Sequence, residues 1–177
     1  MHCILIRHGI AIEPGEWEGS EENRPLTEKG KTRVRQVARG LTRVAMKPTH
    51  LLTSPYVRAY DTARLLRTVL CPSVKVEVRE ELAVGANPEQ LITLLRTLPS
   101  DAVVMCVGHE PFLGEVASLW LCGKSCSSFP LKKAGAACVE FPADVRSGYG
   151  RLQWWLQPMQ LRVLGKRRDG KKHAGKP

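Results

Sequence analysis

The sequence contains no long apolar segment and few aromatic residues, which make up 6% of the chain. No run of about 18 apolar residues occurs, so no transmembrane helix is expected. The first apolar run, Cys3 to Ile6, stops at Arg7 and His8, and we therefore expect no signal peptide there. With 177 residues, 43% hydrophobic and 25% charged, the chain is predicted to form one globular domain. Global disorder, collagen-like repeats and a membrane bundle are excluded.

The six cysteines include no Cys-x-x-Cys pair. Cys3, Cys106 and Cys138 lie in apolar, strand-like runs, where cysteine behaves as a small hydrophobic residue. We therefore expect reduced, structural cysteines and a cytoplasmic protein. Zinc binding is the alternative, but Cys122 and Cys126 have no second His or Cys pair at finger-like spacing, so no metal site is predicted.

Acidic residues are scarce at the C-terminal end, although the net charge of the whole chain is +10. Residues 162–177 contain seven Lys or Arg against the single Asp169, whereas residues 1–161 are only mildly basic. This shift predicts a domain over 1–161 followed by a basic, flexible tail over 162–177. A tail that binds nucleic acid or a membrane surface is the alternative. It is less favoured, because the tail lacks interleaved aromatics and amphipathic periodicity.

Short apolar runs alternate with amphipathic segments along the chain. Strands are expected at 3–6, 50–53, 74–78, 102–107, 136–141 and 151–156, and helices from about 27, over 54–69, from 87 and over 111–121. Ser54-Pro55 and Asn87-Pro88 each predict a helix start with a polar N-cap. This order predicts an α/β fold: a three-layer α/β/α sandwich whose mainly parallel sheet has an antiparallel edge.

Two histidines and two arginines follow three of the predicted strands. Arg7 and His8 follow the first strand, Arg58 lies early in the helix after the second, and His109 follows the strand at 102–107. Ligands of parallel sheets bind beyond the carboxyl ends of the strands. Arginine binds phosphate oxygens with two parallel hydrogen bonds, and a neutral imidazole can attack phosphorus. The placement therefore predicts a phosphate site with one histidine as nucleophile and the other as hydrogen-bond donor.

Four segments resemble the motifs of the histidine phosphatase superfamily, whose fold is called phosphoglycerate mutase-like. They are Ile4-Leu-Ile-Arg-His-Gly9, Ser54-Pro-Tyr-Val-Arg58-Ala-Tyr-Asp-Thr-Ala63, Val107-Gly-His109, and Arg24-Pro-Leu-Thr27 with Gly30. Within this superfamily the chain is similar to the small bacterial phosphohistidine phosphatases of the SixA type. The resemblance implies a hydrolase that removes phosphate from a phosphorylated protein.

The resemblance also implies a role for each matched residue. His8 would become phosphorylated, Arg7, Arg58 and His109 would surround the phosphoryl group, and Arg24 would reach the same pocket. No metal or other cofactor is implied. Glu81 is the candidate general acid, because larger members carry a glutamate in this region. The alternative is that Glu81 is a solvated loop carboxylate or pairs with Arg79.

Short connections between the motifs leave little chain for a lid, which predicts an open site. An open site suits phosphohistidine on a protein. It equally suits small phosphomonoesters, so a small-molecule phosphatase or mutase-like enzyme is the alternative. The loop from Glu13 to Asn23 contains five glutamates. We expect these carboxylates to point outward into solvent; the alternative is a rim that contacts a basic partner surface.

Overall fold

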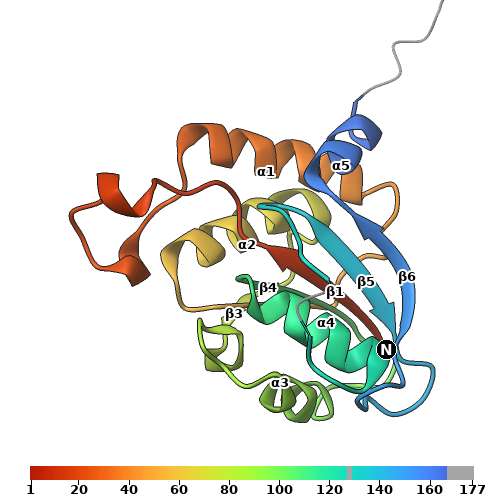
Figure 1. Ribbon diagram of the computed structural model, residues 1–177. Coiled ribbons are helices and arrows are strands. Elements are labelled where there is room, and N and C mark those ends of the chain that lie inside the picture. The colour runs from red at the N-terminus through yellow and green to blue at the C-terminus, as the bar shows by residue number, and fades with distance from the viewer. Residues whose placement is uncertain (127–128, 167–177) are drawn as a thin grey trace, which may run out of the picture.

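The computed structural model describes residues 1–126 and 129–166, which form a six-stranded sheet with helices on both faces (Figure 1). The strands are β1 (His2–Arg7), β2 (His50–Thr53), β3 (Val76–Val78), β4 (Val103–Gly108), β5 (Ala136–Glu140) and β6 (Arg151–Leu156). The helices are α1 (Glu28–Leu41), α2 (Val57–Leu70), α3 (Pro88–Leu95), α4 (Phe112–Cys122) and α5 (Pro158–Leu164), with short 3-10 helices η1 (Pro14–Glu16), η2 (Glu21–Asn23) and η3 (Glu80–Leu82). None of these helices is both long and apolar enough to cross a bilayer.

The sheet has the strand order β3-β2-β4-β1-β5-β6. The first four strands are parallel, β5 is antiparallel to β1, and β6 is antiparallel to β5. Every residue of β4 is buried, as expected of a central strand covered on both faces. The predicted three-layer α/β fold, with its antiparallel edge at the last two strands, is therefore confirmed.

Two apolar clusters separate the sheet from its helix layers. One, which contains Val37, Leu66 and Leu161, lies under α1, α2 and α5. The other, which contains Leu91 and Trp120, lies under α3 and α4. The two helix layers lie on opposite sides of the sheet in Figure 1. Because both faces are covered, the carboxyl-end edge of the parallel strands is the exposed place where polar groups from several strands can meet.

Polar residues cap the first turns of α1 and α3, but the predicted cap of α2 is not observed. Thr27 caps α1 by accepting a hydrogen bond from the Gly30 amide at 2.9 Å, and Asn87 caps α3 as predicted. The prediction that Ser54 caps α2 is wrong, because the N-cap is Tyr56 and the helix begins at Val57. The Ser54 hydroxyl lies instead 2.8 Å from the ring of His109.

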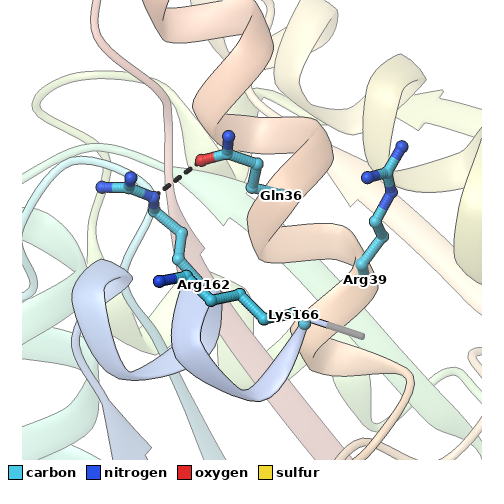
Figure 2. A pocket seen from close by; sticks show the side chains of 5 residues that line it. Gln36, Arg39, Arg162 and Lys166 are labelled. Atoms are coloured by element: carbon cyan, nitrogen blue, oxygen red, sulfur yellow. Dashed lines mark hydrogen bonds between the residues drawn. The ribbon is translucent and has the colours of Figure 1, made fainter. Parts of the chain in front are cut away.

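The short helix α5 is absent from the sequence prediction. It packs against α1 so closely that a Cβ atom on Gly40 would lie 1.9 Å from the Leu161 carbonyl oxygen. Figure 2 shows the hollow beside this contact, where Arg162 Nε donates to Gln36 Oε1 at 2.7 Å. Residues 162–164, predicted as the start of the tail, belong to α5. Gly165 caps this helix and Lys166 follows it, and residues 167–177 of the predicted tail lie outside the described residues.

Candidate active site

The register of three neighbouring strands brings the predicted site residues to one edge of the sheet. Arg7 pairs with Gly108 across β1 and β4, and Thr53 pairs with Val107 across β2 and β4. The residue after each strand end is therefore adjacent in space as well. The rings of His8 and His109 lie 5.1 Å apart, centroid to centroid. Both belong to the wall of an open pocket of about 330 Å³.

His8 is held as a buried, neutral imidazole. Its Nδ1 lies 2.7 Å from the Gly9 carbonyl oxygen, which can only accept, so Nδ1 carries the proton and Nε2 keeps a lone pair. Burial is the main reason that the pKa of His8 falls to about 2, and the electrostatic effect of His109 adds to it. The Gly9 amide in turn donates to Thr62 Oγ1 of α2 at 3.0 Å, which fixes the backbone that orients the ring.

His109 is equally buried and is oriented by Ser54. The Ser54 hydroxyl lies 2.8 Å from Nε2, and the same oxygen accepts a hydrogen bond from the Tyr56 amide at 3.4 Å. His109 Nδ1 is buried and has no hydrogen-bond partner in the described part of the chain. Burial, followed by the positive charge of Arg58, lowers the pKa of His109 to about 3. Two neutral imidazoles therefore face one pocket.

Arg7, Arg24 and Arg58 line the same pocket. Arg7 Nη1 donates to the Leu131 carbonyl oxygen at 2.9 Å, and Arg58, only 4% exposed, stacks over Tyr56 at 4.8 Å. Within the described residues, the Nε atoms of Arg7 and Arg58 are buried without a partner. Burial lowers the pKa of both guanidiniums, which still remain protonated. The pocket thus concentrates positive charge beside two neutral histidines.

Five of the six predicted site residues are brought together, and Glu81 is not. Glu81 lies in η3 and lines a different hollow, beside Gln90 and Thr93 of α3. Arg79 pairs with Glu77 at 2.6 Å, so the structure gives no support to a pair between Arg79 and Glu81. The geometry therefore does not support Glu81 as the general acid of this pocket.

Glutamates that the sequence prediction missed also line the pocket. Glu21 turns inward and forms ion pairs with Arg24 and Arg58, so the expectation that all carboxylates of the 13–23 loop point outward is wrong. Glu110 accepts hydrogen bonds from the amides of Leu131, at 2.7 Å, and Gly114, at 3.3 Å. It fixes the segment whose carbonyl accepts from Arg7. For Glu110, its position directly after His109 was the available sequence signal, whereas no sequence signal distinguished Glu21 from its neighbour Glu22.

No metal-binding cluster accompanies these groups over residues 1–126 and 129–166. There, no set of three or more His, Cys, Asp or Glu side chains is arranged to hold a metal ion. The positive charge of the pocket comes from its three arginines and Lys133, and its histidines are uncharged near neutral pH. Such an arrangement can bind a tetrahedral anion and attack it with the lone pair of His8 Nε2.

The two buried imidazoles make stability depend on pH. Their pKa values lie below the ordinary 6.5, so below pH 6.5 the unfolded chain binds more protons than the folded chain. The free energy of unfolding should therefore fall as the pH decreases from 6.5. His8→Asn should reduce this slope by up to about 1.4 kcal/mol per pH unit, as measured by urea denaturation. A His8→Asn curve parallel to that of the wild type would contradict the prediction.

Comparison with known proteins places this site in a family. Residues 3–85 match the sequence model of the Histidine phosphatase superfamily (branch 1). An uncharacterised protein of Picosynechococcus sp. is 34% identical over 156 residues, which cover 86% of this chain and 89% of the relative. Phosphohistidine phosphatase SixA of Escherichia coli is 24% identical over 165 residues, covering 92% of this chain and 98% of SixA.

Solved structures agree with the sequence matches. A structure of the protein histidine phosphatase SixA complexed with tungstate has a TM-score of 0.78 and 27% identity, and the match covers 91% of this chain and 99% of that one. A mycobacterial glucosyl-3-phosphoglycerate phosphatase shares the fold, with a TM-score of 0.68 at 18% identity over 88% of this chain and 99% of that one. The sequence and structural matches agree with the pocket of arginines and histidines described above. This chain belongs to the histidine phosphatase superfamily and is a phosphatase similar to SixA.

Proposed function

We propose that this phosphatase hydrolyses phosphohistidine on proteins through a covalent intermediate on His8. The observation that carries the proposal is the state of His8: buried, neutral, and held through Nδ1 by the Gly9 carbonyl. Nε2 is then the nucleophilic atom, in a pocket whose other walls include Arg7, Arg58 and His109. The similarity to SixA, itself described as a protein histidine phosphatase, supports the same activity.

The first step transfers the phosphoryl group to the enzyme. Its oxygens bind the guanidiniums of Arg7 and Arg58. In the tautomer in which the Ser54 hydroxyl donates to His109 Nε2, His109 donates from Nδ1. The lone pair of His8 Nε2 forms a bond to phosphorus while the P–N bond of the substrate breaks. The bonding electrons leave with the substrate imidazole, which takes a proton from water. Positive charge from the arginines replaces the role that a metal ion has in other phosphoryl-transfer enzymes.

The second step regenerates the enzyme. A water molecule attacks the phosphorus of phospho-His8, the P–N bond breaks, and the electron pair returns to Nε2. The proton that the attacking water loses leaves with the released phosphate or passes to solvent. Arg7 and Arg58 hold the same oxygens in both steps, so one set of positive charges stabilises both transition states.

The carboxylates around the pocket favour a P–N bond over an alcohol ester. An alkoxide leaving group needs a protonated acid beside it. Hydrogen bonding to Arg24 lowers the pKa of Glu21, so this carboxylate stays ionised. Burial raises the pKa of Glu110, while the amides that donate to both of its oxygens favour its ionised form, and Glu13 pairs with Lys133 at 3.3 Å. An imidazole leaves more readily without such an acid, which supports phosphohistidine as substrate.

The covalent intermediate provides the test. The protein should be mixed with a histidine-phosphorylated protein labelled with ³²P and quenched in alkali within milliseconds to seconds. Phosphohistidine is stable in alkali, so label should appear on the peptide that contains His8. A panel of substrates tests the finer assignment, with phosphohistidine protein expected to exceed 3-phosphoglycerate and phosphoserine in kcat/KM. Label on another residue, or preference for a small phosphomonoester, would count against the proposal.

A further inference from the structure

The carboxylate of Glu21 is bound in the candidate active site as an anionic ligand would be. Its Oε1 and Oε2 accept from Arg24 Nη2 and Nε at 2.6 and 2.7 Å, a two-pronged guanidinium contact. Oε1 also lies 3.0 Å from Arg58 Nη2, and the Glu21 carbonyl oxygen accepts from Arg58 Nη1 at 2.8 Å. One residue of η2 therefore occupies both terminal nitrogens of Arg58 and one edge of Arg24.

This contact is specific to Glu21 within its loop. The Glu21 side chain is 51% exposed but pairs with both arginines, whereas Glu22, the next residue of the same short helix, forms no ion pair in the described part of the chain. Glu13 forms an ion pair with Lys133 at 3.3 Å. Arg58 is almost fully buried, and a buried charge without a partner is costly, so the Glu21 carboxylate stabilises Arg58. The ion pairs with Arg24 and Arg58, two of the arginines that line the proposed phosphate site, therefore hold Glu21 in place.

A phosphoryl group and Glu21 compete for the same donors. The Nη atoms of Arg58 are the groups that would bind phosphate oxygens. In this structure Nη1 donates to the Glu21 carbonyl oxygen, and Nη2 forms an ion pair with the Glu21 carboxylate. Since Glu21 is attached to the chain, it acts at a high effective concentration, and a free anion of equal charge cannot displace it efficiently. A phosphoryl dianion carries twice the charge of a carboxylate and offers three oxygens, so it gains more from the arginines.

We propose that Glu21 is a specificity-determining residue, an internal competitor for Arg24 and Arg58 that admits phosphoryl dianions and excludes carboxylates and singly charged phosphodiesters. The inference rests on the proposed function, in which this pocket binds a transferable phosphoryl group. Phosphohistidine and phosphomonoesters carry the required dianion, whereas nucleic acid backbones and phospholipid diesters do not. Glu21 therefore restricts the site to terminal phosphoryl groups.

The experiment compares Glu21→Gln with Glu22→Gln, which makes the same charge change one residue along the same helix. Binding of inorganic phosphate and of dimethyl phosphate, a monoanionic diester, is measured by titration calorimetry at about pH 8. In Glu21→Gln the dissociation constant for phosphate should fall about tenfold, and dimethyl phosphate should bind measurably. In Glu22→Gln both should stay as in the wild type. Equal or weaker phosphate binding in Glu21→Gln would overturn the inference.

A second measurement uses the wild-type protein, with Glu21 in place, so that the test does not depend on the Glu21→Gln variant alone. Trp17 lies in the same loop, and its Nε1 donates to the Ser20 carbonyl at 2.9 Å, directly before Glu21. Displacement of Glu21 by phosphate should change the Trp17 fluorescence, and the change should vanish in Trp17→Phe. Phosphate binding without this signal would contradict displacement. Failure of phosphohistidine turnover would refute the proposed function alone, because both binding measurements are independent of turnover.

Discussion

His8→Asn is expected to lower kcat for any phosphorylated substrate by about 10⁴-fold or more. Removing the nucleophile of a covalent mechanism leaves only binding and electrostatic stabilisation, which account for a small residual rate. Asparagine keeps a side-chain N–H that can donate to the Gly9 carbonyl, as His8 Nδ1 does at 2.7 Å. The pocket should therefore persist in the variant while the lone pair at Nε2 is lost. Steady-state release of phosphate from phosphohistidine protein is the measurement.

The binding behaviour of the same variant separates chemistry from misfolding. The arginines that hold the phosphoryl group are unchanged, so His8→Asn should still bind inorganic phosphate with a dissociation constant within a few-fold of the wild type. The alkaline quench should yield no labelled peptide. His50→Asn, on β2 and outside the pocket lining, serves as the control and should retain full activity. Substantial turnover by His8→Asn would refute phospho-His8 as an obligatory intermediate.

Strand register explains why so much of the site was predictable from sequence. Arg7, His8 and His109 each follow an apolar run that could only be a buried strand. The pairing of Arg7 with Gly108 then places them side by side. The motif from Ser54 to Ala63 likewise fixes Arg58 in the first turn of α2. The carboxyl ends of parallel strands lie at the same edge of the sheet, so residues that follow such strands are expected to meet there.

Features that depend on loops and side-chain choice were not predictable. The loop before α1 has no periodicity, so nothing in its sequence shows that Glu21, and not Glu22, pairs with the arginines. Ser54 has the chemistry of a helix cap, but its hydroxyl lies on His109, a contact 55 residues away in the sequence. Helix α5 is only seven residues long and is stabilised by packing on Gly40 of α1. Glu81 follows a short edge strand, and the path of η3 takes it away from the pocket.

The second large effect is expected at Arg58. Replacement with alanine removes two terminal N–H donors and one buried positive charge from the phosphoryl site. Loss of a single preorganised donor typically costs about 10²–10³ in rate, so Arg58→Ala should reduce kcat/KM by about 10³-fold. Arg58→Lys keeps the charge but lacks the planar fork, and should recover only part of this loss. Initial rates on phosphohistidine protein, with phosphoenzyme yield after an alkaline quench, provide the measurement.

The control for this prediction lies six residues, or about 1.7 turns, further along the same helix. Arg64 is largely exposed and makes only a 3.9 Å contact with Asp61, so Arg64→Ala should leave kcat/KM unchanged. Arg58→Ala also frees Glu21 from one of its two arginine partners, and the double variant with Glu21→Gln should therefore not show additive effects. A loss at Arg58 no larger than that at Arg64, with the fold intact by circular dichroism, would remove Arg58 from the mechanism and leave Arg7 and His109 to hold the phosphoryl group.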